Sequence, residues 1–398
     1  MLFELLSFLL IFIIFIIFLI DAIPQFNTWQ SRIKIGRFPN QQIWQEKVLS
    51  ISKKWLKSTP TIKLTDNNRL IIIDILKGNY KRNAIQSWQE AALVLGLTEY
   101  ISSTNDSVAR SDIQKFFNSK LNAFGAWKIK PTETDQAILA YSFLNADFID
   151  HQKRKPAFDE TYQMILSLKG EDGTVAYKPH NRNYRFVDTI GFICPFLVSY
   201  GLRFNIPEAI ELAIKQIKEY QNYGMMLQEN IPCHTYELQS KTPAGLFGWG
   251  RGLGWFVIGL IDTWNALPEN HPKKKDLEEI IIKTAKSAFK FQRENGGFSW
   301  LVFVKEARID SSTVATLSWF FTLASQIPEI AEDCKFAKEK GLEYLKKVTR
   351  RNGAVDFSQG DTKGIGVYSQ NFDILPFTQG FVLRTLNTKK LETGVDFH

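Results

Sequence analysis

The sequence predicts an all-α fold in which helical hairpins form two concentric rings, an (α/α)6 toroid. Apolar residues recur at helical spacing along most of the chain, whereas few segments alternate as strands do. The predicted helices are of two kinds, some polar along one face and others apolar nearly all round. The two kinds alternate, and the apolar ones recur about every 55 to 66 residues, which indicates one hairpin per repeat. A flat α-solenoid is the alternative, but its repeats are usually shorter and more regular.

The amino terminus is an apolar segment that predicts a membrane anchor. Residues 5–20 are apolar except for Ser7, and Glu4 and Asp21 bracket them. At about 1.5 Å per residue, this helix is slightly short for a bilayer but long for a signal peptide. No basic residue precedes it and no Ala-x-Ala pattern follows it. We therefore predict an uncleaved, single-pass transmembrane helix over residues 2–23. The alternative, a buried core helix, would need a surrounding shell of protein.

Residues 24–60 form a basic segment next to the predicted anchor. Residues 21–60 hold seven basic and two acidic side chains, a net charge of +5 out of +8 for the whole chain. Anionic headgroups attract such side chains by about 1 kcal/mol each, which makes membrane lipid an expected partner. A nucleic-acid face is the alternative, but no basic stripe or nucleic-acid motif follows, and we predict no such partner. The positive-inside rule favours a body in the cytoplasm.

The body, residues 61–398, is predicted to form the toroid. Polar-faced helices such as 207–221 suit an outer ring, and apolar helices such as 189–200 suit an inner ring. Inner helices are expected to begin near residues 133, 189, 253, 311 and 377. The predicted helices span 42–56, 67–76, 85–102, 108–123, 133–147, 156–168, 189–203, 207–221, 253–266, 274–294, 311–326, 332–349 and 377–387.

Composition restricts the chemistry of the body. Apolar residues make up 44% and charged residues 23%, as in a folded protein. Three widely spaced cysteines give no disulfide framework, and five histidines without a paired motif argue against a transition-metal centre. Aromatic residues reach 13%, which leaves room for a sugar-binding cleft, since flat rings stack on apolar sugar faces.

Two aspartates stand at the start of predicted inner helices. Asp188 precedes the apolar run 189–200, and Asp135 opens the helix that follows it in the same way. Each could be a helix N-cap, a position that suits aspartate. If both instead face one cleft, paired carboxyl groups in unequal surroundings can divide acid and base roles.

The string GWGRGLGW, residues 248–255, is the most unusual in the chain. Its glycines allow close approach of the backbone, Arg251 offers a planar fork for a carboxylate, and Trp249 and Trp255 offer stacking faces. It is not a phosphate loop, because no Gly-Lys-Ser/Thr follows. A tightly packed helix start with a solvent-facing arginine is the alternative.

Two further polar residues are candidates for substrate binding. His234 lies in the polar string PCHTYE and could donate a hydrogen bond to a substrate oxygen, although a lone loop histidine is often incidental. Lys178, ten residues before Asp188, could supply a second positive charge, although a lone lysine is usually solvated.

Together these motifs resemble glycoside hydrolase families 88 and 105. The resemblance rests on VDTIGFICPFL at 187–197, WGRGLGW at 249–255 and DSSTVA at 310–315, and it covers most of the chain after about residue 60. These families are the unsaturated glucuronyl and unsaturated rhamnogalacturonyl hydrolases, built as six-hairpin barrels. This sequence departs from the family pattern at Phe186, where a tryptophan is common, and at Leu253, where an asparagine is usual.

The resemblance implies hydrolysis of oligosaccharides that end in a 4,5-unsaturated uronic acid, through protonation and hydration of the vinyl-ether double bond. It implies Asp188 as general acid and then base, with Asp135 as its partner. It implies no metal and no organic cofactor. The residues expected to bind substrate are Arg251, Trp255, His234, Lys178 and Trp249. The alternatives are a membrane-anchored protein of polysaccharide biosynthesis or assembly that binds glycan in the same cleft, and a scaffold without a glycan cleft.

Overall fold

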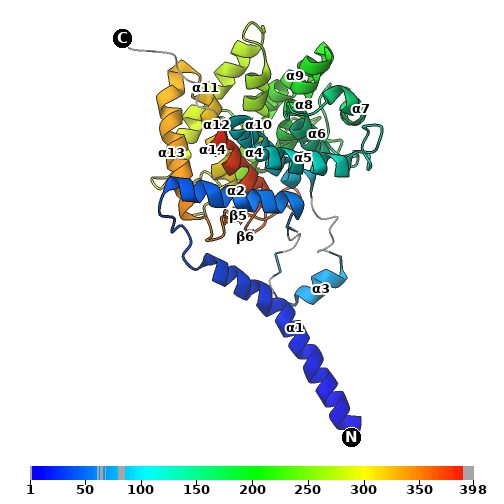
Figure 1. Ribbon diagram of the computed structural model, residues 1–398. Helices are drawn as coiled ribbons and strands as arrows, with labels where there is room; N and C mark the ends of the chain where they lie inside the picture. The colour runs from blue at the N-terminus through cyan, green and yellow to red at the C-terminus, as the bar shows by residue number, and fades with distance from the viewer. Residues whose placement is uncertain (1, 61, 63–65, 68, 79–85, 389–398) are drawn as a thin grey trace.

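The computed structural model describes residues 2–60, 62, 66–67, 69–78 and 86–388. Within these residues, six apolar helices form an inner ring (Figure 1). Each packs against the next, and the last packs against the first, which closes the ring. This closed arrangement confirms the predicted toroid. The inner helices are α4 (Ser87–Thr104), α6 (Ala137–Leu144), α8 (Val187–Phe204), α10 (Gly250–Ala266), α12 (Ser311–Ala324) and α14 (Pro376–Asn387).

Six amphipathic helices surround this ring. They are α2 (Gln41–Lys57), α5 (Ser107–Lys120), α7 (His151–Ser167), α9 (Pro207–Tyr223), α11 (Lys274–Phe291) and α13 (Ala331–Lys347). Helix α2 lies inside the predicted basic segment 24–60, yet it packs on α14 and α4. Its apolar stripe, with Trp44 and Val48 fully buried, faces the ring, while its lysines face outward. The toroid therefore begins at α2, before the boundary predicted at residue 61.

The contact that closes the ring depends on glycine. A Cβ atom added to Gly380 of α14 would lie 2.1 Å from the carbonyl oxygen of Ala92 in α4. One added to Gly96 of α4 would lie 2.4 Å from the carbonyl oxygen of Gly380. Both distances are far inside van der Waals contact, so only glycine lets the first and last inner helices approach this closely.

Short strands lie at the end of the toroid where the inner helices begin. Strand β3 (Ile231–Glu237) pairs antiparallel with β1 (Tyr184–Phe186), β2 (Met225–Met226) and β4 (Pro243–Phe247). A separate pair joins β5 (Ser358–Gln359) to β6 (Phe372–Asp373). The string PCHTYE was expected to be a loop. It forms most of β3. Nearly all side chains of this strand are buried, so it lacks the alternation of apolar and polar residues by which a half-buried strand is predicted.

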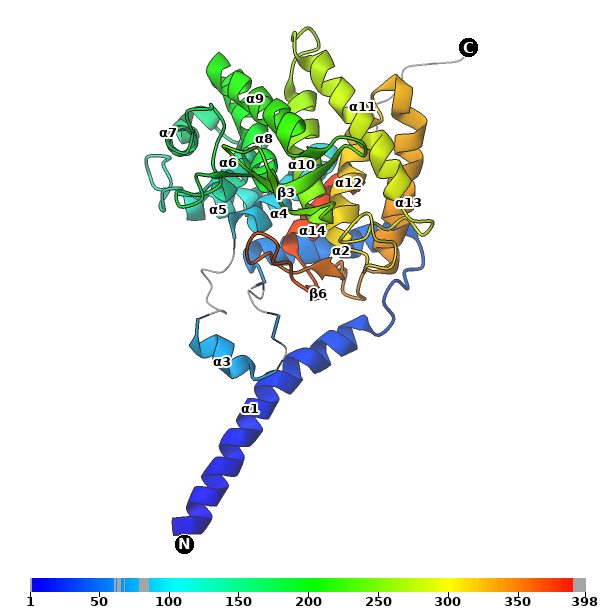
Figure 2. The ribbon, with the colours of Figure 1, turned by 180° about the vertical axis from the view of Figure 1, so that it is seen from behind.

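Helix α1 (Leu2–Arg32) leads away from the body and buries none of its residues (Figure 2). Its most apolar window has a mean hydropathy of 3.1, enough in length and composition to cross a bilayer. The helix is longer than the predicted anchor at 2–23, because it continues through Pro24 to Arg32. Helix α8 also passes the test of length and hydropathy, but 72% of it is buried, as an inner helix of the toroid requires.

Three short helices complete the described chain. Helix α3 (Ile71–Leu76) is shorter than the predicted helix 67–76 and lies beside α1. The 3-10 helices η2 (Thr134–Gln136) and η3 (Pro328–Ile330) precede α6 and α13. Helix η2 takes the first turn of the predicted helix 133–147, and it carries Asp135.

Candidate active site

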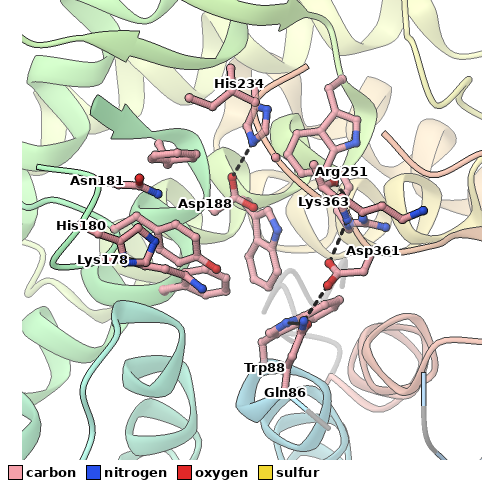
Figure 3. A pocket seen from close by; sticks show the side chains of 18 residues that line it. Gln86, Trp88, Lys178, His180, Asn181, Asp188, His234, Arg251, Asp361 and Lys363 are labelled. Atoms are coloured by element: carbon pink, nitrogen blue, oxygen red, sulfur yellow. Dashed lines mark hydrogen bonds and ion pairs between the residues drawn. The ribbon is translucent and has the colours of Figure 1, made fainter. Parts of the chain in front are cut away.

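A pocket of about 430 Å³ opens among the amino-terminal ends of the inner helices (Figure 3). Side chains from α4, α8, β3 and α10 and from the segment 361–365 before α14 line it. Six of the seven predicted site residues are among the lining residues, and Asp135 is not. The six are Lys178, Asp188, His234, Trp249, Arg251 and Trp255.

Asp188 occupies the centre of this pocket, at the junction of β1 and α8. The N-cap of α8 is Phe186, and Asp188 is the second residue of the helix, so the N-cap alternative for Asp188 is wrong. Its Oδ2 atom is buried and has no hydrogen-bond partner among the described residues. Burial raises the pKa of the carboxyl group to about 7, with Arg251 opposing the rise. Asp188 can therefore hold a proton near neutral pH.

His234 lies next to Asp188 and is neutral. Its Nε2 atom is 3.8 Å from Asp188 Oδ2, beyond hydrogen-bond distance, and its Nδ1 atom is 3.2 Å from the hydroxyl oxygen of Tyr368. Burial, helped by the charge of Arg251, lowers the pKa of His234 to about 4. The ring is thus an uncharged group that is held in place by Tyr368 and can accept or donate one hydrogen bond toward the pocket.

Arg251 is engaged by the protein rather than free for a substrate carboxylate. Its Nη1 atom donates to the carbonyl oxygen of Gln359 at 2.5 Å, and its Nη2 atom donates to that of Gly360 at 2.7 Å. The guanidinium is 5.3 Å from the ring of Trp249, whose Nε1 atom also donates to Gln359. The side chain therefore fixes the segment after β5 and places a positive charge near Asp188. A solvent-facing arginine, the alternative raised from the sequence, is also wrong, since Arg251 is only 2% exposed.

Arg251→Lys is expected to loosen the segment that Arg251 holds. An ammonium group cannot reproduce the two parallel hydrogen bonds of the guanidinium, and a hydrogen bond from a charged donor contributes roughly 1.5–3 kcal/mol. We expect the free energy of unfolding to fall by about that amount and KM to rise more than kcat falls. Denaturant titration and steady-state kinetics measure both quantities. Arg182→Lys, at an exposed arginine, is the matched control, and equal effects of the two changes would contradict the role assigned to Arg251.

Trp255 is part of the wall beneath the pocket. It is 2% exposed and packs against Phe192, Phe377 and Trp88 at ring-centroid distances of 4.4, 4.7 and 5.6 Å. Trp249, also 2% exposed, lies 4.8 Å from the ring of His234. Both predicted stacking residues border the pocket, and each is almost fully buried in a cluster of aromatic side chains.

Lys178 lines the pocket, whereas Asp135 lies in η2, outside the residues that line it. Glu133, not Asp135, caps η2. Burial raises the pKa of Asp135 to about 6, and Glu133 adds to the rise while Lys178 opposes it. Asp135 and Asp188 both raise the pKa of the intervening Tyr177 hydroxyl, although burial is the larger cause. Lys178 Nζ is 2.8 Å from Glu133 Oε2 and lines the pocket.

Sequence reasoning missed the contribution of the first and last inner helices. Gln86 and Trp88 from the start of α4, and Asp361 and Lys363 from the segment before α14, also line the pocket. Gln86 Nε2 donates to Asp361 Oδ2 at 2.6 Å, which joins the two segments across the ring closure. The signal was present: a polar string, SQGDTKGIG, stands before α14 just as polar strings stand before the other inner helices.

The fold and the pocket together define a class of protein. It is an (α/α)6 barrel with a pocket at its mouth, in which aromatic side chains surround a buried carboxyl group whose pKa is raised to about 7. Residues 61–383 match Glycosyl Hydrolase Family 88, and the chain belongs to this family. The resemblance drawn from the sequence is thereby confirmed.

Known relatives agree with this assignment. The chain is 23% identical over 229 residues to an unsaturated 3S-rhamnoglycuronyl hydrolase of Alteromonas sp. (strain LOR). The match covers 52% of this chain and 54% of that protein, so the chain spans about half the length of the curated relative it matches.

Solved structures share the fold over nearly their whole length. A possible member of glycoside hydrolase family 105 from Klebsiella pneumoniae has a TM-score of 0.74 and 15% identity, over 88% of this chain and 94% of that one. The unsaturated glucuronyl hydrolase from Bacillus sp. GL1 has a TM-score of 0.66 and 17% identity, over 87% and 97%. At these identities the likeness establishes the six-hairpin toroid and no more.

Proposed function

We propose that this protein hydrolyses oligosaccharides that end in an unsaturated uronic acid. The observation that carries the proposal is the buried Asp188 carboxyl group, whose Oδ2 atom is unpartnered among the described residues and whose pKa is about 7. A double bond in a vinyl ether accepts a proton on carbon, and this requires an acid that is still protonated near neutral pH. Membership of the family and the activities of the Alteromonas and Bacillus relatives support the same chemistry.

In the proposed reaction, Asp188 transfers its proton to C4 of the 4,5-double bond, and positive charge develops at C5 and the ring oxygen. Water then adds to C5, and the Asp188 carboxylate accepts the proton that this water loses. The resulting hemiketal opens to a ketone at C5, and the hemiacetal left at C1 breaks down to an aldehyde and releases the next sugar. The 3.8 Å gap between His234 Nε2 and Asp188 Oδ2 leaves both groups free to contact that water or a sugar hydroxyl.

The remaining side chains are assigned to binding and to charge control. Asp135 is the proposed partner of Asp188 and keeps negative charge on that side of the pocket. Lys178 and Lys363 line the pocket and can attract the uronate, although each also pairs with a carboxylate, Glu133 and Asp66 respectively. Trp249, Trp255 and Arg251 shape the wall.

Unsaturated disaccharides prepared with polysaccharide lyases test this proposal directly. The purified full-length protein should consume them, which removes the ultraviolet absorbance of the conjugated double bond. Saturated disaccharides of the same sequence are the control and should not react. Binding of glycan without any turnover would instead favour the alternative function, a membrane-anchored protein of polysaccharide assembly.

The pH dependence of activity should reflect the two aspartates. A carboxyl group with a raised pKa is protonated below that pKa, so kcat/KM should fall as the pH rises through about 7, where Asp188 loses its proton. It should also fall as the pH drops through about 6, where Asp135 gains one. Measured kcat/KM should therefore peak between these values. Asp135→Asn should remove the acidic limb and keep the alkaline one, and a profile that is flat through pH 7 would contradict the role of Asp188.

We also propose that α1 anchors the chain in a membrane with the body on the cytoplasmic side. The apolar run at 5–20, the hydropathy of α1 and the basic residues that follow support this arrangement. A carboxyl-terminal reporter that is active only outside the cytoplasm should give no signal, while a cytoplasm-active reporter should give a strong one. The reverse pattern would place the body, and its substrate, on the outer side.

A further inference from the structure

Helix α3 presents an apolar face that is exposed among the described residues. Leu70, Ile73, Ile75 and Leu76 are 53%, 45%, 45% and 81% exposed, whereas Ile71 is buried. The helix has only six residues, too few to be stable alone in water. Something outside the described chain is therefore expected to cover this face.

The position of α3 relative to α1 indicates what that is. The backbone N–H groups of Leu70 and Ile71 donate to the carboxylate of Asp21 at 2.7 and 2.9 Å, which ties the start of α3 to α1. Asp21 is the first charged residue after the apolar run 5–20, so it marks the level at which α1 leaves the hydrocarbon of a bilayer. The exposed apolar side chains of α3 are held at that same level.

The residues around α3 suit the membrane surface. Arg69 and Lys77 flank it and are exposed, where they can reach headgroups while the apolar face enters the acyl boundary. Trp29, on the next turns of α1, is 61% exposed, and tryptophan favours the interface between lipid and water.

The edge of the toroid next to α1 carries β5 and β6. Arg32, the last residue of α1, pairs with Asp356 at 2.7 Å and donates to the carbonyl oxygen of Phe372 at 3.3 Å. Asp356 lies just before β5, and Phe372 is in β6. Strand β5 contains Gln359, which Arg251 and Trp249 bind at the edge of the pocket. Figures 1 and 2 show α1 leaving the outer edge of the toroid, beside α2 and β6.

We propose that α3 is a second membrane contact, an interfacial helix that lies in the headgroup region and, with α1, holds the edge of the barrel that carries β5 and β6 next to the bilayer. The proposal rests on the membrane insertion of α1 proposed above.

Depth-dependent quenching tests this directly in the full-length protein, reconstituted into vesicles of phosphatidylcholine and phosphatidylglycerol. The three native cysteines are buried, so an environment-sensitive dye can be attached to one introduced cysteine. Ile73→Cys reports on α3 and Phe12→Cys reports on α1. Val108→Cys is the matched control, because Val108 is 64% exposed and begins α5, at the end of the toroid opposite the mouth.

Spin-labelled lipid with the nitroxide near the headgroup should quench the dye at position 73 and leave the dye at position 108 unquenched. Adding Leu76→Asp should abolish the quenching at position 73, whereas adding Val108→Asp should not. The proposal is overturned if position 73 behaves like position 108 while a deep nitroxide quenches position 12. If position 12 is also unquenched, the insertion of α1 itself fails, and the proposal for α3 fails with it.

Discussion

Asp188→Asn is expected to lower turnover of an unsaturated uronide by at least ~10²-fold and up to ~10⁴-fold, the usual contribution of general acid–base catalysis. The amide has the volume of the carboxyl group but cannot give a proton to carbon. Because Asp188 Oδ2 has no hydrogen-bond partner among the described residues, the substitution breaks no hydrogen bond at that atom. The unfolding temperature and the binding of glycan should therefore stay close to those of the wild type.

Asp147→Asn is the matched control for this change. The Asp147 side chain is 88% exposed and pairs with Arg203 near the carboxyl-terminal ends of the inner helices, so its loss should affect neither turnover nor binding. Steady-state kinetics of the two variants, with a calorimetric measure of binding, separate chemistry from affinity. Full turnover by Asp188→Asn would end the proposed mechanism.

The sequence was sufficient to predict the architecture because helices leave a strong local pattern. The inner helices are apolar nearly all round, and the outer ones carry one apolar stripe, so their alternation predicted both rings. The basic side chains of α2 predict a segment next to a membrane, although its apolar residues recur at helical spacing as those of the other outer helices do. Its lysines are compatible with the toroid, since they lie on the outer face, and Lys53, for example, pairs with Asp106 at 2.7 Å.

The site was harder to predict because it depends on contacts between distant segments. The polar string before each inner helix identified Asp188, His234 and Arg251, which the structure brings to one pocket. What Arg251 binds could not be read from its neighbours in sequence, because its partners, Gln359 and Gly360, lie about a hundred residues further along the chain. The planar guanidinium group, which predicted a carboxylate ligand, can equally well donate two hydrogen bonds to two backbone carbonyl groups.

A buried charged network lies near the carboxyl-terminal ends of the inner helices, away from the pocket. Arg384 Nη1 of α14 donates to Asp262 Oδ2 of α10 at 2.7 Å, and the two side chains are 3% and 1% exposed. Trp319 of α12 and Tyr141 of α6 also donate to Asp262, at 2.8 and 3.1 Å. Four of the six inner helices therefore meet at one carboxylate.

Arg384→Met should destabilise the protein by about 3–5 kcal/mol, the usual cost of leaving a buried charge without its partner. Methionine fills much of the space but leaves Asp262 with only neutral donors. Lys286→Met is the control, because the pair of Lys286 and Glu329 is more than half exposed and contributes about 0–1 kcal/mol. Denaturant unfolding of both variants in detergent measures the difference. In the folded Arg384→Met variant, kcat/KM should still fall as the pH rises through about 7, because the network does not border Asp188. Equal losses in the two variants would show that the network does not hold the inner ring together.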